Sequence, residues 1–161
     1  MINVIKHAWK KFQPPQVYAE VLLDHIELSD SYLMLGLSLG WHNDTLEPIQ
    51  VEEVHIRLYH EGTRQEPVLF YPQGHFAHLP GQKVIKKTVG AKSFVLPPGE
   101  THLAGIRFFT RTILVLADGT YPLEIHATVS NGTYVHEAQV KVTSRLKYRT
   151  SEPWIPQDSL V

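Results

Sequence analysis

The sequence lacks several features that would tie it to a particular class of protein. It contains no cysteine, which excludes disulfide bonds, thiolate nucleophiles and cysteine metal ligands. It also has little net charge, because 15 lysines and arginines nearly balance 16 aspartates and glutamates, giving −1 at pH 7. Nucleic-acid binding needs clustered cations to contact the phosphates, so we expect no nucleic-acid partner.

Long apolar runs are missing as well. No run reaches the roughly 20 residues of a transmembrane helix. Lys6, His7, Lys10 and Lys11 interrupt the N-terminal region, which therefore differs from a secretory signal. We expect a soluble, cytoplasmic protein. The length of 161 residues and the hydrophobic content of 43% suit one globular domain with its own core.

The motifs of common enzyme classes are absent too. The sequence has no Gly-x-Ser-x-Gly elbow, no glycine-rich phosphate loop and no His-Glu-x-x-His motif, so we expect neither catalysis nor a cofactor. The 10 histidines leave one alternative open, in which His75 and His78 bind a metal ion with a distant third ligand such as His42, His102 or Asp44. We interpret the histidines instead as surface and cross-strand residues, because a zinc site needs three or four converging ligands.

The sequence does contain a period-two alternation of apolar residues, which is typical of β-strands. The clearest row consists of Leu33, Leu35, Leu37, Leu39 and Trp41. Because side chains alternate across a strand, this row predicts a strand face directed wholly into the core. The alternation changes phase near Asp24 and at Glu52-Glu53, which predicts bulges or crossings between sheets. Residues 72–82 are predicted to form a loop.

A hairpin is predicted near the C-terminal end of the strand region. Asn131-Gly132 is the preferred pair for a type I′ turn, because both central residues need a positive φ angle. With this pair at its centre, the turn places Val129 opposite Tyr134 and Tyr121 opposite Val142. One face of the hairpin is then almost wholly apolar, so turn chemistry and hydrophobic phase agree.

Two motifs resemble those of the immunoglobulin-like superfamily. Tyr121 follows a turn, in the position of a tyrosine corner, and Pro97-Pro98-Gly99-Glu100 precedes a strand, as is common in such domains. The resemblance covers residues 17–142. It departs from antibody domains at Leu123, where they keep a cysteine, and in the absence of a tryptophan from the third strand. It implies a sandwich with edge strands and end loops that can bind, and it carries no specific function.

The predicted fold class is therefore all-β, a two-sheet antiparallel immunoglobulin-like sandwich of about seven to nine strands. The sandwich would occupy residues 16–147, between a short N-terminal amphipathic helix with its Pro-Pro break at residues 1–15 and a C-terminal tail at residues 148–161.

The N-terminal helix is the first candidate binding element. At about 100° per residue, its apolar side chains fall on one side and its lysines on the other; the candidate partner-binding residues are Ile2, Ile5, Lys6, Trp9, Lys10 and Phe12. Pro14-Pro15 ends the helix. Such a helix docks into a partner's groove or contacts an anionic membrane surface. The alternative is that it caps an open end of its own domain.

The second candidate site lies in the segment 70–79, where the predicted ligand-binding residues are Tyr71, His75, Phe76 and His78. Aromatic side chains on a loop can stack on a sugar or anchor a partner, unless the loop tucks them beneath itself. We therefore predict a non-catalytic interaction module that binds another protein, or a second copy of itself, through an edge strand, an end loop or the N-terminal helix. The alternative is a small-ligand or carbohydrate-binding domain that uses the segment 70–79.

Overall fold

The computed structural model describes residues 17–60, 66–78, 85–89, 93–112, 114–130 and 132–150. The helix predicted for residues 1–15 lies outside them. The described residues form the strands β1 (Val17–Leu28), β2 (Leu33–Asn43), β3 (Ile49–Leu58), β4 (Val68–His78), β5 (Ile85–Val89), β6 (Phe94–Leu96), β7 (Thr101–Thr110), β8 (Gly119–Val129), β9 (Gly132–Val142) and β10 (Lys147–Arg149), with a short 3-10 turn, η1 (Ser144–Leu146). None of them forms a helix with the length and apolar character that crossing a bilayer requires.

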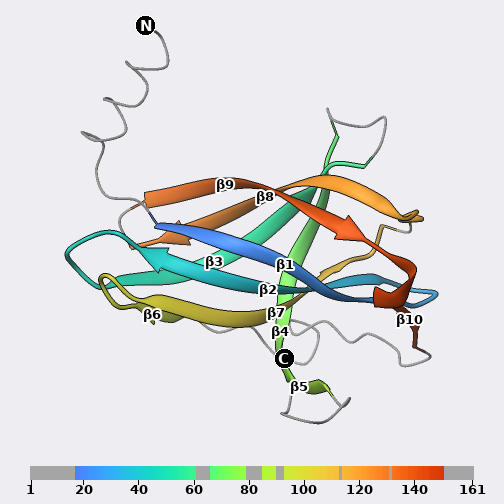
Figure 1. The fold of residues 1–161 in the computed structure, drawn as a ribbon, viewed down its shortest axis with the longest axis horizontal. Helices are drawn as coiled ribbons and strands as arrows, with labels where there is room; N and C mark the ends of the chain where they lie inside the picture. The colour runs from blue at the N-terminus through green and yellow to red at the C-terminus, as the bar shows by residue number, and fades with distance from the viewer. Residues whose placement is uncertain are drawn as a thin grey trace, which may run out of the picture.

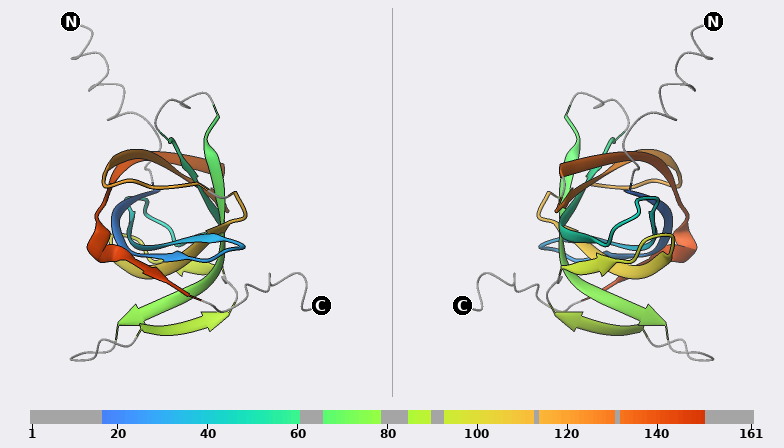
Figure 2. Two further views of the ribbon diagram at one scale, coloured as in Figure 1. Left: turned by 90° about the vertical axis from the view of Figure 1, so that its right-hand side faces the viewer. Right: turned by 90° about the vertical axis from the view of Figure 1, so that its left-hand side faces the viewer.

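The strands form one mixed sheet, so the two-sheet antiparallel sandwich predicted from the sequence is wrong. The strand order is β10-β1-β2-β7-β4-β3-β8-β9, with β5 paired to β4 and β6 paired to β3. The pairing of β1 with β10 is parallel, whereas β1 pairs with β2, and β8 with β9, in the antiparallel sense. The sheet curls into a half-barrel, and the end-on views of Figure 2 show its strands arranged around the core.

The continuity of the sheet depends on β4, which crosses the direction of the other strands (Figure 1). Its first residues pair with β3 and its later residues pair with β7. A register shift between Pro72 and His75 accompanies this change of partner, and proline is tolerated at such bulges because no ladder N–H is required there. The prediction of a loop at residues 72–82 is therefore wrong for residues 72–78, which belong to β4. A strand that changes partner loses the regular alternation by which strands are recognised.

The concave side of the sheet encloses the apolar core. The row predicted on β2 is confirmed, since Leu33, Leu35, Leu37, Leu39 and Trp41 are all buried. Both predicted phase changes are bulges: the register shifts between Leu23 and His25 in β1, and between Val51 and Glu53 in β3. The two irregular places in the alternation therefore mark real irregularities of the sheet.

The hairpin of β8 and β9 forms, but in a different register from the prediction. Val129 pairs with Gly132 and Tyr121 pairs with Val140, so each pair is displaced by two residues along β9. Alternation has a period of two, so a displacement of two keeps the same side chains on the inner face. Hydrophobic phase therefore could not tell the two registers apart. Gly132 has a φ angle of 145°, in the region that favours glycine.

The tyrosine at the start of β8 makes the local contact that its position suggested. The Tyr121 hydroxyl donates a hydrogen bond of 2.7 Å to the Ala117 carbonyl, four residues upstream, which is the bond that defines a tyrosine corner. This bond fixes the entry into β8. It coexists here with a single curled sheet rather than with the sandwich that the resemblance implied.

Candidate functional site

A single row of outward-facing side chains runs around the sheet and organises its surface. We call it the outer row; in strand order it consists of Tyr148, Glu27, Met34, Phe109, Tyr71, His55, His126 and Val135. Its exposure changes sharply along its length: Glu27 is 1% exposed and Phe109 is 4% exposed, whereas Tyr71 is 52% exposed. We call the outward side of β10, β1, β2 and β7 around Glu27 and Met34 the covered face, and the outward side of β4, β3, β8 and β9 the open face; farther along β1 and β7, Leu22 and Leu103 are exposed. Tyr71 stands at their boundary.

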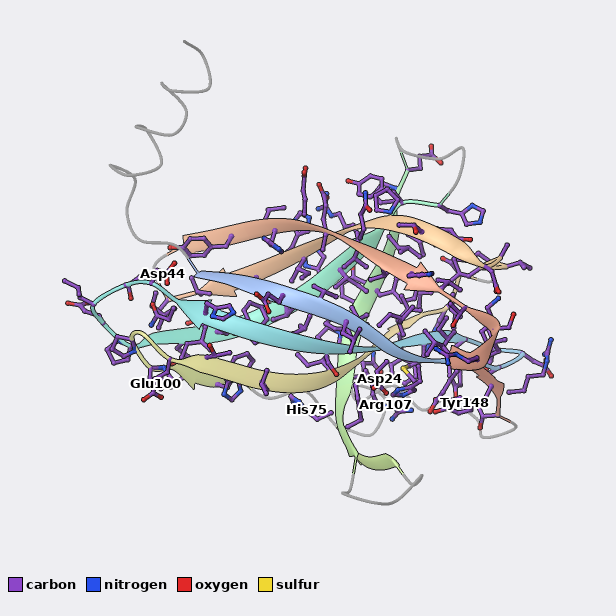
Figure 3. All side chains as sticks on the ribbon, viewed as in Figure 1. Asp24, Asp44, His75, Glu100, Arg107 and Tyr148 are labelled. Carbon is purple, nitrogen blue, oxygen red and sulfur yellow. The ribbon has the colours of Figure 1, made fainter. Side chains whose placement is uncertain are left out.

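The covered face holds a buried ion pair. Arg107 on β7 donates a hydrogen bond of 2.9 Å to the Glu27 carboxylate on β1, and the Tyr148 hydroxyl on β10 donates one of 2.6 Å to its other oxygen. Burial, and then the bond to Glu27, raise the pKa of Tyr148, so its hydroxyl keeps the donated proton. Arg107 also lies 4.9 Å from the centre of the Phe109 ring. Figure 3 labels Tyr148 beside β10, and Asp24 and Arg107 between β4 and β10.

His25 completes the covered face beside this ion pair. Its Nδ1 lies 2.7 Å from an Asp24 carboxylate oxygen, and its ring meets the Phe76 ring edge-on at 4.7 Å. Gly36 lies directly beneath, where a methyl group would overlap the His25 ring. Phe76, predicted to bind a ligand, is only 7% exposed. Its contact with His25 makes it a packing residue.

A groove follows β4 at the boundary between the two faces. Its first hollow, of about 410 Å³, opens where β4 leaves β3 for β7. Val54 and Ile106 contribute buried apolar surface to this hollow. Its polar and aromatic lining consists of Glu52, Glu53, His55, Tyr71, His75 and Phe94.

The second hollow, of about 760 Å³, lies along the first part of β4 and the end of β7. Its lining includes Glu66, Leu69, Tyr71, Gln73, Arg111 and Thr112. Tyr71 lines both hollows, so the two together form what we call the β4 groove, with the exposed tyrosine at its centre. Both volumes fall within the range of small-molecule sites, roughly 300 to 1,000 Å³.

Histidine rings support Tyr71 from the open face. The His55 ring lies 6.0 Å from the Tyr71 ring and stacks on the His126 ring at 4.7 Å. His126 in turn contacts the Glu124 carboxylate at 3.1 Å, and Tyr59 donates a hydrogen bond of 2.8 Å to the same oxygen. This bond from Tyr59 is the main cause of the lowered pKa of Glu124. The row holds one side of Tyr71 in place.

The two histidines of the first hollow have lowered pKa values. For His55 the main cause is burial, followed by the nearby His126 and Arg57. Burial also lowers the pKa of His75, against the effect of a hydrogen bond with the Gly105 backbone. Both rings are therefore neutral at pH 7, and a neutral imidazole has one donor and one acceptor nitrogen. The two rings therefore add no positive charge to the groove.

The predicted site residues are placed very differently from one another. Tyr71 and His75 line the β4 groove, whereas Phe76 is buried; His78 ends β4, and its side chain is not described. The candidate residues of the N-terminal helix, Ile2, Ile5, Lys6, Trp9, Lys10 and Phe12, lie outside the described residues. Within the described ranges, no three histidine, aspartate or glutamate side chains gather closely enough to hold a metal ion.

Sequence reasoning missed most of the groove. Glu53 and His55 line it from β3, Gln73 from β4, and Arg111 from the residues that follow β7. Nothing in their local sequence sets them apart, because only the crossing of β4 brings them together. The one available indication was the phase change at Glu52-Glu53, which marks the bulge at the edge of the first hollow.

Comparisons with known proteins do not assign this chain to a family. No family model matches the sequence, and no curated protein matches it. Among solved structures, a FixG-related protein from Vibrio parahaemolyticus is 11% identical, with a TM-score of 0.44, over 80% of this chain and 96% of its own. A putative ApaA protein from Bordetella pertussis is 16% identical, with a TM-score of 0.43, over 82% of this chain and 98% of its own. Similarities at this level support no inference about function.

Proposed function

We propose that this protein is a non-catalytic binding domain whose ligand lies in the β4 groove. The observation that carries the proposal is the position of Tyr71, which is 52% exposed and lines both hollows. Large exposed aromatic side chains are costly to leave in water, and they are enriched at binding sites, where they bury much surface with few rotatable bonds. Leu69, 37% exposed, lies beside it in the second hollow.

The geometry supports this groove more than it supports binding through an edge strand. β9 ends the sheet, but β1 lies beside it as the sheet curls toward closure. β10 pairs with β1 over Ile26–Leu28. A sheet whose end strands lie together presents less free backbone for an added strand. We therefore adopt the alternative from the sequence analysis, a ligand-binding site in the segment 70–79. Its residues belong to the strand β4 and not to a loop.

The proposal is tested by locating where small molecules bind. Amide chemical shifts of the isotope-labelled full chain would be recorded with a library of neutral, anionic and cationic fragments. We expect the largest changes at the amides of Tyr71, His75 and Arg111, which surround the groove.

Two variants sharpen this experiment. Tyr71→Ala should abolish the changes, whereas Leu103→Ala should leave them intact, because Leu103 is an exposed apolar residue on β7 that lines neither hollow. If fragments bind only at other places, or if no fragment binds, the proposal that the groove is the functional site is wrong.

A further inference from the structure

We infer that the occupant of the β4 groove is a neutral, hydroxyl-rich molecule of the oligosaccharide class. This inference rests on the proposed function, since it names the ligand of the same groove. Three properties of the lining lead to it: an aromatic platform, mixed hydrogen-bonding groups, and a charge balance that opposes anions.

The platform is the Tyr71 ring. His55 lies 6.0 Å from it with an angle of 35° between the ring planes, and 52% of Tyr71 is exposed to solvent. The face of an aromatic ring carries partial negative charge, which attracts the weakly positive C–H groups of an approaching molecule. A sugar ring presents such C–H groups on one face and hydroxyls around its rim. The buried Val54 and Ile106 give the first hollow an apolar surface that suits the same face.

The hydrogen-bonding groups suit hydroxyls, which both donate and accept. Glu53 and Glu66 are exposed carboxylates that accept, and Arg111 is a guanidinium that only donates. Gln73 adds a side-chain amide to the lining of the second hollow, and an amide can both donate and accept.

The charges argue against other ligand classes. Among the residues that the structure describes, three carboxylates, those of Glu52, Glu53 and Glu66, line the groove with one guanidinium, Arg111, and the lowered pKa values of the two histidines favour their neutral form. Phosphates and acidic polymers need clustered cations, which the described part of the lining lacks. These carboxylates would attract an organic cation, but Tyr71 is the one exposed ring that it would meet, since Phe94 is only partly exposed, and cation recognition uses a cage of several rings. A neutral ligand encounters neither obstacle.

The test is a panel of neutral and acidic oligosaccharides presented to the full chain, followed by titration calorimetry with any neutral saccharide that binds. We expect Tyr71→Ala to weaken binding by about tenfold or more and Tyr71→Phe to retain it, because stacking uses the ring and not the hydroxyl. Gln73→Leu should weaken binding about threefold to tenfold through the lost amide of the lining. Leu103→Ala is the matched control and should bind as the wild type does. The affinity should also change little with salt, because no charge is neutralised.

The outcomes separate this inference from the proposed function. If fragments bind in the groove but no neutral saccharide does, the ligand class is wrong and the groove stands as a binding site. Binding that is confined to acidic glycans or peptides and falls steeply with salt also overturns the ligand class. If neither fragments nor saccharides bind there, both proposals fail. Saccharide binding that survives Tyr71→Ala would place the site elsewhere and overturn the inference directly.

Discussion

The two faces on the outside of the half-barrel use similar residues for opposite purposes. The covered face has a glutamate, an arginine, a histidine and a tyrosine, and it buries the Glu27 and Arg107 side chains against each other. The open face has the same four residue types, in Glu124, Arg57, His126 and Tyr59, but leaves them partly exposed, whereas Glu27 is almost fully buried. Residue type alone therefore does not reveal whether a polar cluster on a sheet stabilises the fold or is available for binding; its burial does.

The strongest test of this contrast removes one half of the buried ion pair. Arg107→Met leaves the Glu27 carboxylate buried without its ion-pair partner. We therefore expect the free energy of unfolding to fall by about 3 to 5 kcal/mol. The measurement is urea denaturation at neutral pH. The double variant Glu27→Leu/Arg107→Met should be more stable than Arg107→Met alone, because no charge is then left unpaired. A single variant as stable as the wild type would show that the covered face does not depend on this pair.

Tyr148→Phe tests the third member of the covered face. It removes a hydrogen bond to a buried carboxylate, and we expect a loss of about 1.5 to 3 kcal/mol. The pKa of Tyr148 is raised above the ordinary 10.0 of tyrosine, so the stabilisation is complete below pH 10 and is lost as the pH rises through the higher folded-state pKa. The difference between wild type and variant should therefore be constant at neutral pH and narrow above pH 10. A difference that widened there would contradict the proposed role of the hydroxyl.

Gly36→Ala tests how tightly the covered face is packed. The added methyl would overlap the His25 ring, and we expect a loss of about 1 to 3 kcal/mol. Gly40→Ala is the matched control on the same strand, because its nearest neighbour would be the flexible Leu103 side chain at 3.5 Å. The double variant His25→Ala/Gly36→Ala should show a smaller penalty than the two single changes added together. Strict additivity would mean that the ring and the glycine do not constrain each other.

On the open face, removal of a large side chain should hardly affect stability. Tyr71→Ala removes an exposed side chain, and we expect the free energy of unfolding to change by no more than about 0.5 kcal/mol. Circular dichroism during denaturant titration checks this value alongside the ligand-binding measurements. If Tyr71→Ala lowered the free energy of unfolding as much as Arg107→Met does, the open face would contribute to stability as the covered face does, and the contrast between them would be wrong.

The smallest effect concerns mildly acidic pH. The pKa values of His55 and His75 lie below the ordinary 6.5 in the folded protein, so the unfolded chain takes up protons first as the pH falls. Stability contributed by these neutral rings is full above pH 6.5 and is lost as the pH falls through their folded-state pKa values. Denaturation measured across this range should show a decline that His55→Gln and His75→Gln each make shallower. A variant with the full decline would show that its histidine does not contribute to it.

The residues themselves explain how far the sequence could be interpreted. The alternation from Leu33 to Trp41 identified a core strand, because one inward face requires an apolar residue at every second position. It did not indicate that Met34, between them, is also fully buried, since burial of the outward side depends on distant segments. The hairpin register was wrong by two residues, because period-two patterning fixes the face of a strand but not its partner.

The candidate site was less predictable than the fold, for the same physical reason. Tyr71 and His75 were identified as aromatic and polar side chains in one segment, and both line the groove. Phe76, adjacent to His75, was indistinguishable in the sequence but packs against His25. Neighbours along a strand point to opposite sides, and the side that faces solvent is set by the crossing of β4. That crossing depends on pairing with both β3 and β7.

The bond between Tyr148 and Glu27 has a consequence for how the chain is made. The two residues are 121 positions apart, so β1 leaves the ribosome long before the hydroxyl that completes its surroundings. Until then the Glu27 carboxylate has its bond from Arg107 but lacks the one from Tyr148. Such a non-local requirement raises the contact order and slows folding. We therefore expect the covered face to reach its full stability only after synthesis has passed β10.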